Sequence, residues 1–354
     1  MNHSTPEART AVMGALDALA RMRSGGQLSL PRAGRALDSA VPVLPACVVV
    51  EAAAHAYDDR LVLKGVTLSI HRGEIYGLIG ANGAGKTTLM KAICGRMSLT
   101  SGTVRVDGGD PARDASARRR IGFVPQDIAI YPHLTVSENL QVFARLAGVP
   151  RSEVKRVVAD TIERAGLGQY TRQLTRMLSG GYRRRVNICA SILHDPVLLV
   201  LDEPTVGIDI DARAAIHGML DDMRRRGTAI LLTTHDLEQA EEMCDRVGFL
   251  AGGLLVREGK PEVLLHQAYG EDRELVATLR SPPDQSGRAF LQQIGFLATK
   301  SPITWFGHGP LEGLDAATLG RQIAGAGMVV SEIRIRRPDL GSLFLEIVGE
   351  EGRA

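Results

Sequence analysis

The sequence predicts an α/β fold in which parallel strands alternate with helices. The apolar segment Ile75–Ile79 leads into a glycine-rich loop and then into a helical stretch over 87–95. Residues 197–201 form a continuous apolar run of strand length, which is typical of a strand buried on both faces of a parallel sheet. The alternation then repeats as a helix, a strand and a helix, over 211–226, 229–233 and 237–244.

Shorter segments complete the α/β region. Apolar and alternating runs predict strands at 47–51, 66–70, 103–106 and 121–124. A helical block is expected over 135–170, with a break at 148–150, where Gly-Val-Pro interrupts the pattern. The first 46 residues are rich in Ala, Arg, Gly, Ser and Pro without a sustained period. We therefore predict a largely disordered extension there, with one short helix over 6–22.

The length of the chain favours more than one domain. At 354 residues it is long for a single compact unit, and the sequence turns polar near 270–273. We place a boundary there and predict three parts: the extension over 1–46, the α/β domain over 47–270 and a small accessory α+β domain over 271–354. Helices over 289–294 and 316–324, set between three strands, are expected in the accessory domain.

Composition excludes several classes of protein. A net charge of +2 gives no polyelectrolyte character, so no nucleic-acid partner is predicted. The four cysteines are scattered and form no C-x-x-C pair, which argues against zinc and against a disulfide framework. No stretch approaches the roughly 18 apolar residues that span a bilayer. If the protein serves a membrane, another chain must supply the spans.

The glycine-rich loop is the strongest chemical signal. Residues 80–87 read Gly-Ala-Asn-Gly-Ala-Gly-Lys-Thr, between a predicted strand and a predicted helix. Glycines let backbone N–H groups converge on a phosphate, and the following helix adds its positive end. Lys86 is expected to reach the β- and γ-phosphates, and the Thr87 hydroxyl to bind Mg²⁺. The alternative is a flexible glycine turn. The candidate nucleotide-binding residues of the loop are Gly80, Asn82, Gly83, Ala84, Gly85, Lys86, Thr87 and Thr88.

Two carboxylates follow the apolar run at 197–201. Ligands of open α/β sheets collect at the carboxyl ends of the strands, which is where Asp202 and Glu203 lie. Asp202 is the expected partner of Mg²⁺. Glu203 is placed to orient or deprotonate the attacking water. An Asp-Glu pair alone is a weak signal, because acids often end strands, but beside the glycine loop it predicts nucleotide hydrolysis.

Between these two halves, residues 178–181 read Leu-Ser-Gly-Gly. Here the sequence resembles the nucleotide-binding subunits of ABC transporters, whose signature motif is Leu-Ser-Gly-Gly-Gln. In isolation these residues could be a mere helix cap. The resemblance covers roughly residues 48–268, and further matches stand in the family's order. These are the adenine-stacking aromatic at Tyr57, the Q-loop glutamine at Gln126, the signature residues Ser179, Gly180 and Gly181, the D-loop at 206–209 and the switch histidine at His235.

The resemblance implies a fold and a reaction. The expected fold is a P-loop NTPase cassette, with a RecA-like core, an antiparallel β subdomain and a helical subdomain over 47–270. Its expected ligands are ATP and Mg²⁺, with Gln126 touching the metal and His235 the γ-phosphate. Glu203, His235, Gln126 and Lys86 would be the catalytic residues. For Tyr57, an ordinary tyrosine at a strand edge remains the alternative.

The resemblance also implies partners. Two cassettes, as a homodimer or a heterodimer, would close head to tail so that the Ser179 and Gly181 of one chain complete the other chain's ATP site. A separate transmembrane permease would hold the pair peripherally at the cytoplasmic face of the inner membrane. Tyr182 in place of the usual Gln, the D-loop variants Val206 and Ile208 and the tail at 338–345 resemble an exporter subgroup for drugs, lipids or polysaccharides.

Alternatives remain at this stage. An apolar patch of Tyr131, Leu134 and Phe143 could dock the permease, or could be ordinary packing of the helical subdomain. A soluble ATPase of this family acting on nucleic acid or ribosomes is the rival class, and the balanced charge argues against it. A regulatory ATP-binding protein without turnover conflicts with the presence of Glu203.

Overall fold

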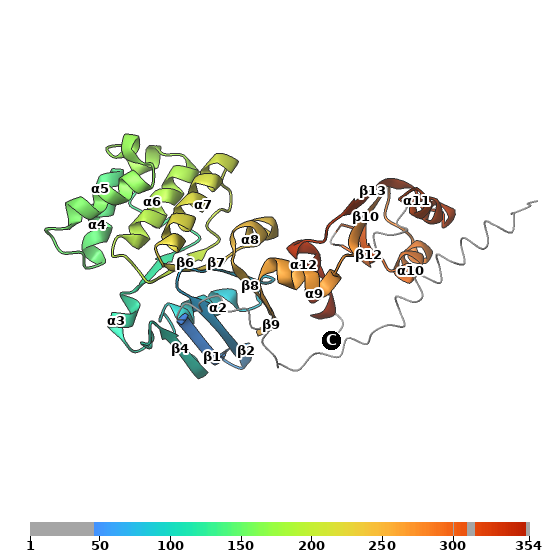
Figure 1. Cartoon of the computed structure of the whole chain (residues 1–354), viewed down its shortest axis with the longest axis horizontal. Helices are drawn as coiled ribbons and strands as arrows, with labels where there is room; N and C mark the ends of the chain where they lie inside the picture. Colours follow the sequence, from blue (N-terminus) through green and yellow to red (C-terminus); the bar gives the residue numbers. More distant parts are fainter. Residues whose placement is uncertain (1–45, 300, 310–315, 352–354) are drawn as a thin grey trace, which may run out of the picture. The chain divides into compact units, whose positions relative to one another are not determined.

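The computed structural model describes residues 46–299, 301–309 and 316–351. The predicted extension and its helix over 6–22 therefore lie almost entirely outside the described residues. The chain divides into two compact units. We call residues 46–268 with 339–351 the cassette unit, and residues 269–338 the accessory unit (Figure 1).

The cassette unit is built on a six-stranded sheet in the order β5-β6-β7-β3-β8-β9. Its first five strands run parallel, and β9 is antiparallel to β8. All residues of β3 and β7 and all but the last of β6 are buried, which explains their unbroken apolar sequences. The strands are β5 (Ile121–Val124), β6 (Leu198–Asp202), β7 (Ala229–Thr233), β3 (Ile75–Ile79), β8 (Arg246–Ala251) and β9 (Leu254–Gly259).

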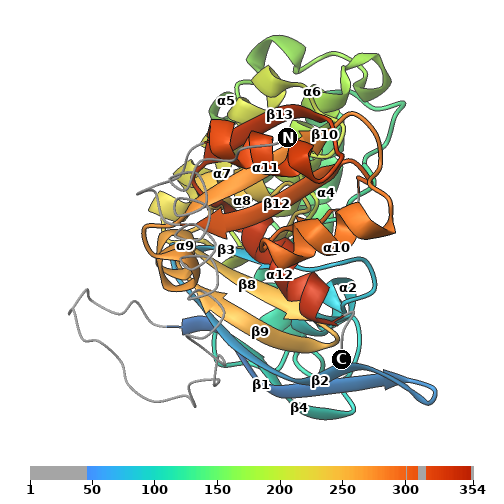
Figure 2. The same ribbon diagram turned by 90° about the vertical axis from the view of Figure 1, so that its right-hand side faces the viewer.

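A second, antiparallel sheet lies beside the first, in the order β2-β1-β4. Its strands are β1 (Ala46–Tyr57), β2 (Arg60–His71) and β4 (Ser101–Val106). They run side by side along one edge of the cassette unit (Figure 2). Helix α2 (Lys86–Ile93) packs with both sheets in one apolar core. The predicted strands at 47–51 and 66–70 are therefore parts of one long hairpin, which ends where Tyr57 pairs with Arg60.

The helices between β5 and β7 gather at the other end of the cassette unit (Figure 1). The predicted break at 148–150 is confirmed, because α4 ends before it and α5 begins after it. Thr135 and Glu138 form a capping box that starts α4. Besides α2 and the last helix of the chain, the helices of the unit are α3 (Ala115–Arg118), α4 (Val136–Leu146), α5 (Val154–Arg164), η1 (Gly168–Tyr170), η2 (Thr175–Met177), α6 (Gly180–Ile192), α7 (Ile210–Arg225), α8 (Leu237–Met243) and α9 (Pro261–Tyr269).

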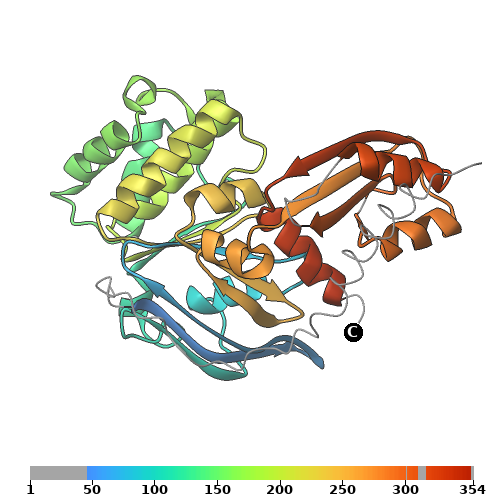
Figure 3. The same cartoon turned by 45° about the vertical axis from the view of Figure 1, so that its right-hand side comes forward.

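The accessory unit is a four-stranded antiparallel sheet with helices on one face (Figure 3). Its strand order is β11-β12-β10-β13, and Leu275, Ala277, Leu291 and Ile323 belong to its core. The predicted helix over 289–294 begins four residues earlier than expected. The elements are β10 (Arg273–Leu279), α10 (Gln285–Gln293), β11 (Leu297–Ala298), β12 (Thr304–Gly309), α11 (Ala316–Gly325) and β13 (Val330–Arg336).

The last helix, α12 (Leu340–Glu351), groups with the cassette unit. Leu340 and Leu343 are buried, and the Leu340 N–H donates to Glu241 Oε2 of α8 at 3.0 Å. We expected 271–354 to form one accessory domain, whereas contacts place 339–351 on the cassette. The boundaries of the extension, the α/β domain and the accessory domain stay predictions. Within the described ranges, the structure contains no helix with the length and apolarity needed to cross a membrane.

Candidate functional site

The glycine loop connects β3 to α2, as the sequence predicts. Gly83 and Gly85 have φ values of 86° and 108°, which side-chain-bearing residues rarely adopt. Gly80 is required for another reason, because a Cβ there would lie 2.4 Å from the Leu250 carbonyl oxygen. Gly85 also caps α2, so the unpaired N–H groups of the first helical turn open onto the loop. The loop thus has the backbone of an anion-binding site.

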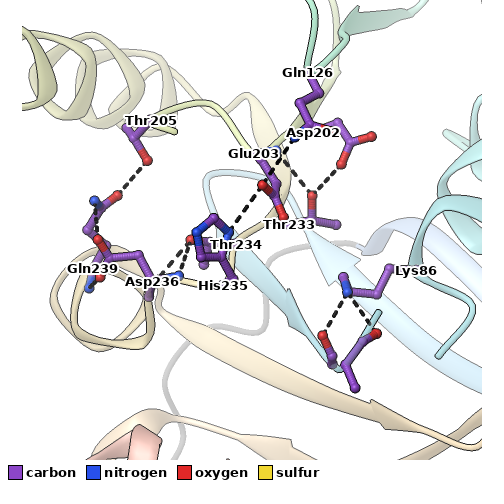
Figure 4. Close-up of polar contacts among 12 residues, drawn as sticks. Lys86, Gln126, Asp202, Glu203, Thr205, Thr233, Thr234, His235, Asp236 and Gln239 are labelled. Carbon is purple, nitrogen blue, oxygen red and sulfur yellow. Dashed lines mark hydrogen bonds and ion pairs between the residues drawn. The ribbon is translucent and has the colours of Figure 1, made fainter. Parts of the chain in front are cut away.

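Lys86 folds back over this loop. Its Nζ donates to the carbonyl oxygens of Gly80 at 2.7 Å and Ala81 at 3.1 Å (Figure 4). Burial lowers the pKa of Lys86, while the nearby carboxylates of Glu203 and Asp202 oppose that shift. A phosphate group entering the loop would offer the ammonium charged oxygens in place of neutral carbonyls, and charge-assisted hydrogen bonds are the stronger kind.

The two candidate carboxylates end β6, and neighbouring β7 holds them. Thr233 Oγ1 donates to Asp202 Oδ1 at 2.7 Å, and the Glu203 N–H donates to Thr233 Oγ1 at 3.2 Å (Figure 4). Thr233 was not among the site residues predicted from the sequence. Its register opposite Asp202 in the parallel sheet is the signal that would have found it.

Glu203 brings two other predicted residues together. Its Oε2 lies 3.4 Å from Gln126 Nε2 and 3.1 Å from His235 Nδ1 (Figure 4). The Glu203 backbone has a φ of 48°, the left-handed region that non-glycine residues rarely enter. Such a conformation costs about 1–3 kcal/mol and is found where the surrounding structure enforces it, commonly at functional sites.

A pocket of about 320 Å³ is lined by residues of the glycine loop together with Gln126, Asp202 and Glu203. It opens beside Tyr57, whose side chain is 46% exposed at the tip of the β1–β2 hairpin. Arg60 and Val62 of the same hairpin also line it, and neither was predicted from the sequence. The predicted residues in its lining are Tyr57, Asn82, Gly83, Gly85, Lys86, Thr87, Thr88, Gln126, Asp202 and Glu203.

The signature residues stand apart from this pocket. Ser179 caps α6, and Ser179 and Gly180 are exposed. Among the described residues, the pocket lining includes neither of them, nor Gly181. Their backbone N–H groups at the start of a helix are nevertheless oriented to meet an anion. The structure therefore places two separate candidate half-sites on one chain.

Tyr182, the departure from the usual signature glutamine, packs within the helical region. Its ring lies 4.1 Å from that of Tyr170, and the Arg185 guanidinium lies 4.3 Å from the ring centroid of Tyr182. Tyr182 is also packed against the apolar core that α4, α5 and α6 share. Its contacts in this chain thus anchor the signature helix to its own subdomain.

Gly181 is expected to contribute to the stability of the fold, whereas Gly180 is not. A Cβ on Gly181 would lie 2.3 Å from the Ala212 Cβ of α7, while one on Gly180 meets nothing within 4 Å. Gly181→Ala should therefore lower the free energy of unfolding by about 1–3 kcal/mol, the range for overpacking. Gly180→Ala, the matched control, should be neutral or slightly stabilising in a helix. Chemical denaturation of the two variants checks this, and equal stability would contradict it.

A parallel sheet that brings a phosphate loop and paired carboxylates to one edge defines the class of P-loop nucleotide hydrolases. The family model described as "ABC transporter" matches residues 63–206. A Nod factor export ATP-binding protein I from Ralstonia nicotianae is 35% identical over 313 residues, covering 86% of this chain and 94% of that protein. The linearmycin resistance ATP-binding protein LnrL from Bacillus subtilis is 32% identical, covering 83% of this chain and 96% of that protein.

Solved structures agree with the fold. The cbiO1 protein from Clostridium perfringens, part of the ABC transporter complex cbiONQ, superposes with a TM-score of 0.59 at 29% identity, over 63% of this chain and 92% of that one. A dimeric ATP-binding cassette bound to ADP and Pi, in a post-hydrolysis state, superposes with a TM-score of 0.54 at 26% identity. The match covers 60% of this chain and 98% of that one. This chain belongs to the ABC transporter family and is an ATP-binding, ATP-hydrolysing subunit.

Proposed function

We propose that this chain powers an exporter by hydrolysing ATP at two composite sites formed by a pair of cassettes. The observation that carries this proposal is the pocket in which the glycine loop, Gln126, Asp202 and Glu203 converge. Tyr57 would stack on the adenine, the loop with Lys86 would hold the phosphates, and Ser179, Gly180 and Gly181 of the other cassette would cover the γ-phosphate.

The oxygen donors near the loop fit Mg²⁺. Thr87 offers a hydroxyl, Asp202 a carboxylate and Gln126 a side-chain carbonyl, and hard oxygen ligands of this kind suit a small divalent cation. Thr233 already donates to Asp202 Oδ1, which fixes the orientation of that carboxylate. When bound, the ion would neutralise charge on the β- and γ-phosphates.

Glu203 is proposed to accept the proton of the attacking water. The water oxygen would form the new bond to the γ-phosphorus as the bond to the β–γ bridging oxygen breaks, so that ADP leaves. His235 and Gln126 flank Glu203 Oε2 at 3.1 and 3.4 Å and would orient this carboxylate and the γ-phosphate. The chain thereby contributes positioning and charge, which account for most of the catalysis in phosphoryl transfer.

The separation of the two half-sites supports a dimer, since ATP in one pocket would be completed by the signature helix of another chain. The pair could be homodimeric or heterodimeric. We further propose that a separate permease holds the pair at the cytoplasmic face of the inner membrane. The names of its relatives, Nod factor export and linearmycin resistance, support export as the direction.

The permease contact is proposed to lie on the segment after Gln126. Tyr131 is 48% exposed, and its ring lies 5.8 Å from that of Phe143. Phe143 is partly buried against the helical core, so part of the predicted patch serves packing as well.

Isolation of the full chain from detergent-solubilised membranes tests the proposal. Co-purification with a polytopic permease, together with ATPase activity, is the expected result. Association with ribosomes that RNase abolishes, in the absence of a permease, would instead support the rival class of soluble ATPases and overturn the transport assignment.

Replacement of Tyr57 by alanine is expected to weaken nucleotide binding with little effect on the fold. Stacking of a base on an aromatic ring contributes about 1–3 kcal/mol, so the Kd for ATP should rise roughly 5- to 150-fold. Tyr57→Phe keeps the ring and should bind like the wild type. Fluorescence titration with a nucleotide analogue measures the change, and an unaltered Kd in Tyr57→Ala would show that Tyr57 is only a strand-edge residue.

A further inference from the structure

One charged side chain near the site has no role in the reaction described above. Arg184 lies in α6, five residues after Ser179, and is only 3% exposed. Its neighbour Arg183 is exposed, and Arg185 is half-buried against Tyr182. A buried arginine is costly unless every one of its donors is satisfied, so its partners matter.

All of these partners are main-chain carbonyl oxygens. A guanidinium carries five N–H donors, and the structure gives Arg184 five acceptors within hydrogen-bond distance. Two lie on the Q-loop segment: Nη1 is 2.7 Å from the Pro125 oxygen and 2.9 Å from the Gln126 oxygen. Three lie at the end of β6: Nη2 is 3.1 Å from the Asp202 oxygen and 2.7 Å from the Glu203 oxygen, and Nε is 2.8 Å from the Pro204 oxygen.

This arrangement joins three segments that the reaction needs. The carbonyls of Gln126 and Glu203 belong to two proposed catalytic residues, and α6 carries the signature residues. The hydrogen bond from Arg184 to the Glu203 carbonyl oxygen is also made to the residue whose backbone φ is 48°. A rigid planar fork can satisfy carbonyls on both segments at once, whereas a lysine ammonium has three donors at a single point.

We infer that Arg184 is a positioning residue for hydrolysis, which fixes the backbones of Gln126 and Glu203 relative to each other and to the signature helix. This inference rests on the proposed function, because it acts through the proposed base Glu203. Binding of a ligand at Ser179 would be transmitted along α6 to the Arg184 side chain. The hydrogen bonds of Arg184 to the Gln126 and Glu203 carbonyl oxygens would then carry it to the Glu203 carboxylate. Arg184 touches neither the glycine loop nor Tyr57 in its hydrogen bonds, so ATP affinity should depend on it only weakly.

The test compares Arg184→Lys and Arg184→Gln with Arg164→Gln, an exposed arginine on α5, in the purified full chain. A misplacement of about 1 Å can lower a rate about 10²-fold, so kcat for ATP hydrolysis should fall about 30- to 100-fold in both Arg184 variants. The KM for ATP should stay within about threefold, and nucleotide-binding stoichiometry should show a folded site. Arg164→Gln should match the wild type. An unchanged kcat, or a loss of kcat and ATP binding together, would overturn the inference.

A double-mutant comparison separates positioning from general loss of structure. In a Glu203→Gln background, Arg184→Lys should lower the residual hydrolysis less than about threefold, because the group it positions is gone. The same fold-loss in both backgrounds would show that Arg184 does not act through Glu203, and the inference would fail while the proposed function stands. If Glu203→Gln alone hydrolyses ATP at the wild-type rate, the proposed function itself fails.

Discussion

Replacement of Lys86 by alanine is expected to lower ATP turnover about 10²- to 10³-fold, the range for losing one preorganised electrostatic stabiliser of a transition state. In the structure the ammonium lies over the loop, 2.7 Å from the Gly80 oxygen, with Asp202 and Glu203 close enough to influence its pKa. No other lysine or arginine of the described residues except Arg60 lines the pocket. Nothing in the loop itself could therefore take over the positive charge at the phosphates.

The loss should appear in binding as well as in rate. A hydrogen bond to a charged group contributes about 1.5–3 kcal/mol, so the Kd for ATP should rise roughly 10- to 150-fold. Steady-state ATPase assays and nucleotide titrations measure the two effects. Lys91→Ala is the matched control, since Lys91 lies exposed in the last turn of the same helix and does not line the pocket. Wild-type activity in Lys86→Ala would refute the glycine loop as the phosphate site.

The central part of the fold could be predicted because burial on both faces makes parallel strands recognisable. The runs at 75–79 and 197–201 and the strand at 229–233 are neighbours in the observed sheet, and the loops that follow them carry most of the site. Parallel strands deliver their carboxyl ends to one edge. Lys86, Asp202 and His235 could therefore be expected to lie together even though the order of the strands was unknown.

Other features depend on tertiary contacts that no local pattern encodes. The helix α12 was not predicted, since its apolar residues also suit the strand that was expected to end the chain. Its buried face is set by α8, about a hundred residues earlier. Thr233 and Arg184 were missed for the same reason, because their roles come from hydrogen bonds to segments distant in sequence.

The candidate site also contains a feature that sequence reasoning would have argued against. A glutamate in the left-handed region is unfavourable, yet Glu203 adopts a φ of 48° between hydrogen bonds to Thr233 and Arg184. The surrounding groups determine that conformation, and they are the ones that sequence analysis could not identify. Strain of this kind is set by where the tertiary structure holds the carboxylate, and not by the local backbone preference of glutamate.

Replacement of Glu203 by glutamine is expected to reduce hydrolysis about 10²- to 10⁴-fold, the range for losing a positioned general base. The amide is nearly isosteric but cannot accept the proton of the attacking water. Gln126 and His235 would still flank it, and the loop and Lys86 would be unaltered. ATP binding should therefore persist, and the proposed dimer should be trapped in its ATP-bound form because the step that reopens it is blocked.

Size-exclusion chromatography in ATP and Mg²⁺, followed by quantification of bound nucleotide, measures this outcome alongside the ATPase rate. The expected result is a stable dimer holding unhydrolysed ATP in Glu203→Gln and a largely monomeric or transient species in the wild type. Glu238→Gln serves as the control, since it makes the same change at an exposed carboxylate three residues beyond His235. Because the glutamine removes proton acceptance while leaving the binding groups in place, trapping without turnover would assign Glu203 to the chemical step. Wild-type turnover in this variant would exclude Glu203 as the base and leave the two half-sites without a hydrolytic residue.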